Sequence, residues 1–289
     1  MDRRVGTLVS LALLVPVLVS AQTQRKVVFV SAMDRTGSPV VNLTAADFEV
    51  LVGGVKQGVT RATFSMPMRI VLLVDASAAV SPMLTFFRGG LNAFVDAMPA
   101  GDEIAVISTA GQIGVRQAPT TDRTKLHAVI DRFAPEGGGN AFLDALVEAD
   151  KRFLKNVPDR WPVFVILTTD AGEMQGSPDI EEFNAFVHDF VARVGSAHAI
   201  VVHGQRTGLI SDVAGNLVNN AGGVYDPLAI SNSLADRMKA LAARVAADHQ
   251  AMANRYAIEY AGNAKATQPV EVRIPLDGIT IAVSTRRPF

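Results

Sequence analysis

Between residues 68 and 254, short continuous apolar runs alternate with segments whose apolar residues recur every three or four positions. A run that is apolar throughout is typical of a strand buried on both faces, and the longer period is that of an amphipathic helix. The sequence therefore predicts an α/β fold with a doubly wound, mostly parallel sheet. The predicted strands are residues 69–74, 103–108, 163–168, 199–202 and 223–225, with residues 113–117 returning as an antiparallel edge strand.

Local capping signals predict where three of the helices begin. Ser81 places a capping oxygen before Pro82, a residue favoured at the first helical position. Asp122 is positioned to cap the helix that follows it, and Ser233 with Asp236 has the spacing of a capping box. We interpret the apolar stripes of these helices as core and assign no cofactor to them.

The segments on either side, residues 22–67 and 255–289, contain short β-branched runs bounded by Gly, Pro and Asp, which indicate small antiparallel strands. The expected strands are residues 26–32, 47–52, 256–260, 269–274 and 279–284, with turns at 34–39 and 53–54 and a hairpin at Asp277-Gly278. Neither segment has enough strands to fold alone. We therefore expect the two to pair in one small β module.

The first 21 residues have the layout of a signal peptide. Arg3 and Arg4 precede an apolar run of about 15 residues, and small Ser20 and Ala21 follow it. The run is shorter than the roughly 20 residues of a membrane-spanning helix, and Pro16 interrupts it, so an uncleaved anchor is the less favoured alternative. The sequence predicts cleavage after Ala21 and export to the periplasm or the outside of the cell.

Composition excludes several classes of partner and site. The formal net charge of −1 argues against nucleic acid, which basic proteins bind. The chain has no cysteine, so a lipoprotein is excluded and stability must come from a hydrophobic core without disulfides. After the signal peptide no apolar run is long enough to span a bilayer.

The common catalytic motifs are missing. The sequence contains no GxSxG, HExxH, GxxxxGK or GxGxxG. It therefore lacks the motifs that would indicate a serine hydrolase, a zinc protease, a nucleotidase or a dinucleotide enzyme. The five histidines show no ligand spacing. His203 alone ends a predicted parallel strand, and we interpret it as a solvated or capped histidine in preference to a catalytic base.

Polar residues follow several of the predicted strands. Asp75 and Ser77 come directly after the first, Asp170 closes the third, and Asn140 follows a run of three glycines. In an open α/β sheet these segments emerge at the same edge, where ligands bind. Their oxygen atoms suit a magnesium- or calcium-like ion. The alternative is that each carboxylate only caps a helix or accepts backbone hydrogen bonds.

In order and spacing, four segments resemble a von Willebrand factor type A domain. They are Val71-Leu72-Leu73-Val74-Asp75-Ala76-Ser77, the run from Gly101 to Ser108, the run from Gly138 to Leu146, and Val165-Ile166-Leu167-Thr168-Thr169-Asp170. The likeness covers residues 68–254. Residues 34–50 are also similar to the leader segment of bacterial exported VWFA-related proteins. The resemblance implies a Rossmann-like sheet and a role in protein binding or adhesion.

The same resemblance implies a metal-ion-dependent adhesion site with the ligands Asp75, Ser77, Asn140 and Asp170. In the family, a DxSxS motif, a distant Thr and a distant Asp hold a divalent cation. Here Ala79 replaces the second serine and Asn140 stands where Thr is expected. Because a cation with fewer protein ligands keeps more water, we expect a degenerate site that binds Mg²⁺, or Mn²⁺ or Ca²⁺, more weakly.

Three functions are consistent with these features. The leading prediction is an exported, non-enzymatic module that binds a protein partner through the carboxyl edge of its sheet. The second is a structural component of an envelope assembly with a vestigial metal site. The third is a hydrolase that uses Asp75 and Asp170 for acid-base chemistry, which requires a substrate cleft and separated pKa values.

Overall fold

The computed structural model describes residues 24–175, 179–203, 208–262 and 268–284. At its centre is a six-stranded sheet of order β10-β9-β8-β5-β6-β7, in which only the pair β6 and β7 is antiparallel. The strands are β5 (Met68–Val74), β6 (Glu103–Ser108), β7 (Gly114–Thr120), β8 (Trp161–Thr169), β9 (Ser196–Val202) and β10 (Tyr225–Leu228). The predicted doubly wound α/β sheet is confirmed.

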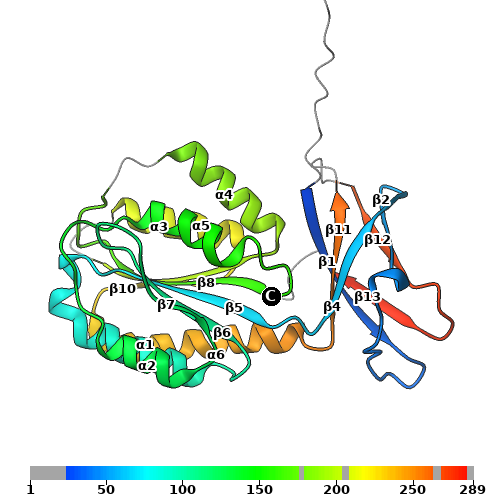
Figure 1. The fold of residues 1–289 in the computed structure, drawn as a ribbon, viewed down its shortest axis with the longest axis horizontal. Helices are drawn as coiled ribbons and strands as arrows, with labels where there is room; N and C mark the ends of the chain where they lie inside the picture. The colour runs from blue at the N-terminus through cyan, green and yellow to red at the C-terminus, as the bar shows by residue number, and fades with distance from the viewer. Residues whose placement is uncertain (1–23, 176–178, 204–207, 263–267, 285–289) are drawn as a thin grey trace, which may run out of the picture.

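Helices cover both faces of this sheet (Figure 1). One layer holds α1 (Leu84–Ala97), α2 (Arg123–Asp131) and α6 (Leu234–Met252), and the other holds α3 (Phe142–Ala149), α4 (Ile180–Ala192) and α5 (Leu209–Ala221). Successive β5 side chains enter opposite cores: Ile70 and Leu72 pack under the first layer, and Val71 and Leu73 under the second. Burial on both faces explains why the strand reads as a continuous apolar run.

The two flanking segments form one β module in two sheets. The first has the order β13-β1-β11-β4 and the second has the order β12-β2-β3, so each combines strands from before and after the central region. The strands are β1 (Gln24–Met33), β2 (Glu49–Val52), β3 (Val55–Gln57), β4 (Val59–Phe64), β11 (Tyr256–Gly262), β12 (Val270–Arg273) and β13 (Thr280–Ser284). Between the sheets lies a separate core that includes Val28, Phe48, Tyr256 and Ile258.

The predicted last strand of the central sheet was misplaced. We expected residues 223–225, whereas β10 is Tyr225–Leu228. Gly223 has a φ of +142°, and a Cβ there would overlap the carbonyl oxygen of Ala197, so this glycine makes a close turn against β9. Pro227 is compatible with β10 because β10 lies at the sheet edge.

Of the three predicted helix starts, the one at Ser81-Pro82 was wrong, and the one at Ser233 has the predicted position without the predicted capping box. Ser81 and Pro82 lie inside a 3₁₀ helix, η2 (Ala78–Met83), and α1 begins only after it. The hydroxyl of Ser233 bonds to the carbonyl of Ile230 at 3.4 Å and does not cap α6, so the predicted capping box does not form. The cap at Asp122 is confirmed, since its carboxylate accepts a backbone N–H of α2 at 3.2 Å.

Two details of the β module also differ from prediction. Asp277-Gly278 is a turn, with Gly278 at φ +81°, but β12 and β13 belong to different sheets and do not form a hairpin. Asp47 lies in the 3₁₀ helix η1 (Ala45–Asp47), where its carboxylate accepts the N–H of Thr44 at 2.7 Å, so β2 begins two residues later. The strands β3 and β4 were not predicted.

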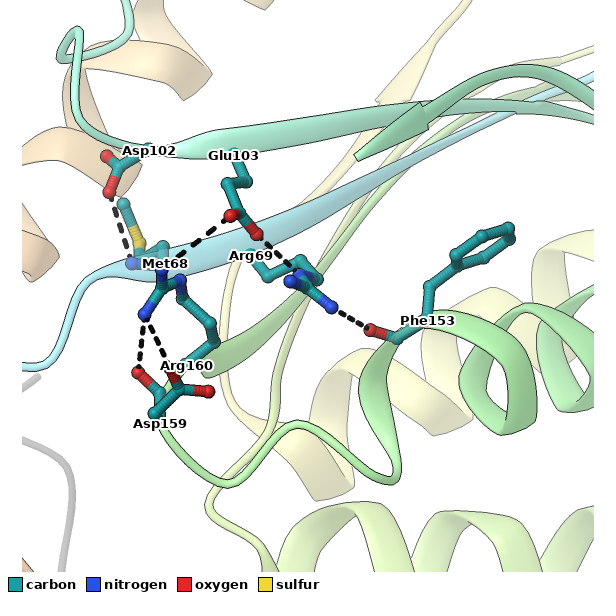
Figure 2. A network of polar contacts seen from close by, with 7 residues as sticks. All are labelled: Met68, Arg69, Asp102, Glu103, Phe153, Asp159 and Arg160. Carbon is teal, nitrogen blue, oxygen red and sulfur yellow. Dashed lines mark hydrogen bonds and ion pairs between the residues drawn. The ribbon is translucent and has the colours of Figure 1, made fainter. Parts of the chain in front are cut away.

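A network of ion pairs holds the amino edge of the central sheet (Figure 2). Glu103 accepts from Arg69 at 2.6 Å and pairs with Arg160 at 3.6 Å, which joins β6, β5 and the start of β8. The buried carboxylate of Asp102 accepts the N–H of Met68 at 3.1 Å. This edge of the sheet faces the β module (Figure 1), and the network ties the amino ends of β5, β6 and β8 to one another.

The predicted signal peptide, residues 1–21, lies outside the described residues. Within the described ranges, every helix is too short or too polar to cross a membrane. Two short helical segments complete the fold: η3 (Asp150–Leu154), a π-helical turn that continues α3, and η4 (Ser231–Ser233) before α6.

Candidate functional site

Four loops meet at the carboxyl edge of the central sheet and are joined by backbone hydrogen bonds. We call them the rim platform, which comprises residues 76–79, 109–112, 136–141 and 171–175. The N–H of Glu136 donates to the carbonyl of Ala76 at 2.6 Å, and Gly111 donates to Gly139 at 3.0 Å. Asn140 forms β-bridges to Ala110 and to Met174. The platform is therefore a continuous hydrogen-bonded surface, although its loops are far apart in sequence.

Asp75 ends β5 directly beneath this platform. Its side chain is almost fully buried, at 1% exposure. One carboxylate oxygen accepts the N–H of Ser77 at 2.8 Å, and the other accepts the N–H of Thr169 and the hydroxyl of Thr168, both at 3.2 Å. Burial raises the pKa of Asp75, and these hydrogen bonds oppose that rise. The carboxylate therefore ties the ends of β5 and β8 together.

Asn140 connects the next two loops from below. It is fully buried, and its amide oxygen accepts the hydroxyl of Thr109 at 2.5 Å. Its amide nitrogen donates to the hydroxyl of Thr168 at 2.9 Å, and that hydroxyl donates onward to Asp75. A chain of buried hydrogen bonds thus runs from the end of β6 through Asn140 to β8 and β5.

Asp170 lies in a second, separate set of hydrogen bonds. One oxygen of its carboxylate accepts from Nδ1 of His203 at 2.7 Å, from the hydroxyl of Ser211 at 2.6 Å and from the N–H of Gly208 at 3.4 Å. Because a carboxylate only accepts, the proton on the imidazole must lie on Nδ1. Gly208 is the N-cap of α5, so the positive end of that helix dipole also favours the carboxylate.

The four residues predicted as cation ligands are thus all buried, at exposures from 0% to 9%, and most of their oxygens already accept protein hydrogen bonds. The hydroxyl of Ser77 is buried and makes no hydrogen bond within the described part of the chain, although it lies close enough to Asp75 to favour the ionised carboxylate. Ala79 adds no oxygen beside it. This arrangement does not fit a cation coordinated directly by all four side chains.

The described residues also contain no group of three or more His, Asp or Glu side chains that could hold a metal ion. The prediction of a Mg²⁺, Mn²⁺ or Ca²⁺ site built from Asp75, Ser77, Asn140 and Asp170 stays a prediction. In this geometry most of the oxygens of these side chains already accept hydrogen bonds from the protein. Of the four predicted ligands, Ser77 is the one whose buried side chain has an atom without a hydrogen-bond partner within the described residues.

Sequence reasoning missed three members of the site. Thr109 holds Asn140, while His203 and Ser211 hold Asp170. His203 was interpreted as solvated or capped, but it is bonded to a buried carboxylate and its side chain is 20% exposed. The sequence feature that could have indicated this contact is the position of His203 directly after β9, because β9 ends beside β8, which Asp170 follows.

Residues 70–173 match the family model described as von Willebrand factor type A domain. This segment is a von Willebrand factor type A domain. Domains of this family generally mediate protein–protein interaction and adhesion. The matched range contains the whole rim platform except its last two residues. No curated protein matches the sequence.

Solved structures of the same domain type share the fold. A von Willebrand factor type A protein from Catenulispora acidiphila is 14% identical with a TM-score of 0.53, over 78% of this chain and 51% of that one. Proximal thread matrix protein 1 from the mussel byssus, with a zinc-occupied metal-ion-dependent adhesion site motif, is 16% identical with a TM-score of 0.50, over 75% of this chain and 50% of that one. This chain therefore spans about half the length of each.

Proposed function

We propose that this chain is an exported, non-enzymatic module that binds a protein partner through the rim platform of its von Willebrand factor type A domain. The observation that carries the proposal is the preorganisation of the platform. Its loops are joined by β-bridges at Asn140, and the buried carboxylates of Asp75 and Asp170 accept backbone hydrogen bonds beneath them. A surface that is ordered before binding pays less conformational entropy on association.

The chemistry of the platform suits a protein surface. Its exposed side chains are small or uncharged apart from two glutamates; they are Ala78, Gln112, Glu136, Ala171, Glu173 and Gln175. The platform contains no lysine or arginine, which argues against a nucleic acid partner. One of the two glutamates, Glu136, is paired with Arg116. A patch with amide groups and little unpaired charge can form hydrogen bonds without the desolvation cost of burying charges.

We propose that Asp75 and Asp170 belong to a degenerate adhesion site and are not the catalytic pair of a hydrolase. A general acid or base must reach a substrate, whereas Asp75 and Asp170 are buried and accept hydrogen bonds from the protein. Asp75 belongs to the β5–β8 network and Asp170 to the α5 network, so the two carboxylates serve different elements.

Partner capture with exposed-surface variants tests the proposal. Ala78→Arg and Ala171→Arg add bulky charged groups at exposed positions and should leave the buried network intact. Ala247→Arg, at an exposed position of α6, is the matched control. In crosslinking from the native envelope, we expect one specific protein to be lost with both rim variants and kept with the control. Equal capture by all four proteins would contradict a role for the platform.

Export is tested separately. The charged start and short apolar run predict a mature chain that begins at Gln22. Intact-mass measurement on protein from the native host should give the mass of residues 22–289. A retained Met1, or recovery only from the cytoplasm, would contradict export without bearing on the rim.

A further inference from the structure

The two hydrogen-bonded sets at the rim point to a role for His203 that the sequence did not indicate. In an adhesion site that works through a cation, the distant Asp and the DxSxS oxygens surround one ion. In this chain the corresponding Asp170 is turned to β9 and α5 instead, where three donors meet one of its oxygens. The separation of Asp170 from the Asp75 network therefore requires an explanation of its own.

We infer that the rim platform is held without a divalent cation, and that His203 is the positioning residue that takes over the cation's structural task by fixing Asp170. The inference rests on the proposed function for its biological meaning. Its physical basis is independent, because it concerns only how the carboxyl edge of the sheet is stabilised.

The first step is that Asp170 needs no further counter-group. Its side chain has no exposed surface, and a buried carboxylate is tolerated only when donors satisfy it. Nδ1 of His203, the hydroxyl of Ser211 and the N-terminus of α5 provide those donors. A cation that approached this carboxylate oxygen would have to compete with all three.

The second step is that the remaining family positions cannot complete a cation shell. Asn140 accepts from Thr109 through its amide oxygen and donates to Thr168 through its nitrogen, so a metal ion would have to share that oxygen with the Thr109 hydroxyl. A Cβ built on Gly172 would lie 3.0 Å from the Cβ of Ala79 and 3.4 Å from the hydroxyl of Ser77. Gly172 therefore packs against both residues, and Ala79 contributes no hydroxyl beside that of Ser77. Hard cations take about six oxygen ligands, and the Ser77 hydroxyl is the one side-chain group at these four positions without a hydrogen-bond partner in the described structure, so most of the shell would have to be water.

The third step is that His203 can do the structural work. It follows β9, which pairs with β8 along its length, and it reaches across the carboxyl ends of these strands to the first residue after β8. The backbone N–H of Asp170 also donates to the carbonyl of Val202 at 3.2 Å. His203 and Asp170 are thus fixed through both backbone and side chain, and the loop 171–175 of the platform starts from this point.

Thermal unfolding of the mature chain with metal alone as the probe tests the inference. We expect the same Tm in EDTA and in about 10 mM Mg²⁺ or Mn²⁺, whereas a site filled at about 100 times its Kd would raise Tm by several degrees. A saturable rise in Tm with either metal that disappears in Asp170→Asn would overturn the inference. This measurement of Tm involves no protein partner. A result that overturns the inference is therefore distinguishable from a result that overturns the proposed function.

Histidine variants test the positioning role. His203→Ala should lower Tm and increase amide exchange in residues 170–175, with no recovery in Mg²⁺. His203→Asn places an amide N–H where Nδ1 stood and should restore most of the protection. His127→Ala, on α2 and away from the rim, is the matched control. If exchange in residues 170–175 is the same in His203→Ala and His127→Ala, His203 does not position the rim.

Discussion

The buried bridge at Asn140 gives the most direct test of how the rim platform is held. Asn140→Ala removes an acceptor for the Thr109 hydroxyl and a donor to Thr168, both in fully buried surroundings. Leaving the Thr109 hydroxyl without an acceptor costs about 1–3 kcal/mol. The void left by the carboxamide adds about 1 kcal/mol, because close-packed surroundings relax only partly. The free energy of unfolding should therefore fall by about 2–4 kcal/mol.

In a chain of this size that loss corresponds to a fall in Tm of about 5–15 °C. Urea unfolding followed by circular dichroism should show a lower midpoint with an unchanged slope, since the exposed area on unfolding stays the same. Asn220→Ala is the matched control, because Asn220 is exposed and bonds only to Asn216 within its own helix. Its effect should stay within about 0.5 kcal/mol.

A double-mutant cycle separates the bridge from simple loss of packing. Thr109→Val removes the hydroxyl that Asn140 holds, so its cost should be largely absorbed once Asn140 is already alanine. The cycle should give a coupling energy of about 1 kcal/mol or more. If Asn140→Ala is as stable as Asn220→Ala, or if the two rim substitutions are additive, then the buried network does not hold the platform.

Two further substitutions test the fold. Gly223→Ala should lower the free energy of unfolding by about 4 kcal/mol or more in chemical denaturation, because the new Cβ would overlap the backbone of Ala197 and because residue 223 has a φ of +142°. The control is Gly89→Ala, at an open position of a helix, which should be neutral or stabilising. Burial raises the pKa of Asp150 despite its ion pair with Arg193, so the stability linked to this group is complete below its unfolded pKa and is lost as pH rises through the folded value. Relative to Asp150→Asn, wild-type unfolding free energy should therefore fall as pH rises above about 4, and a difference that is flat or rises with pH would contradict this.

The strands that were predicted well are those that are buried on both faces. β8 has no exposed residue over its length, and β5 and β9 are nearly the same, so hydrophobicity alone marked them to within three residues at each end. β4 was missed because it is half exposed and mixes Thr and Arg with Val and Phe. A strand of that kind is specified by its partner, here β11, which lies almost 200 residues later in the chain.

The ends of elements depended on competing local interactions. Pro82 fits a 3₁₀ turn as well as a helix start, because its fixed φ is common to both. Ser233 has a backbone carbonyl within reach, and its hydroxyl bonds to that carbonyl instead of to the helix. In both cases the residue type indicated the start of a helical turn, but it did not determine which of two local arrangements would form.

In the site, too, the sequence predicted which residues lie together but not which of their atoms form hydrogen bonds. The ends of strands correctly indicated that Asp75, Asn140 and Asp170 lie at one edge of the sheet, but not which donors face each carboxylate. Asn140 is the instructive case. A threonine at that position would have to accept and donate from a single oxygen, whereas the carboxamide accepts from Thr109 and donates to Thr168 through two separate atoms that span the distance between them. The residue that departs from the cation-binding pattern is thus the one able to bridge two buried hydroxyls, which favours a rim held by hydrogen bonds.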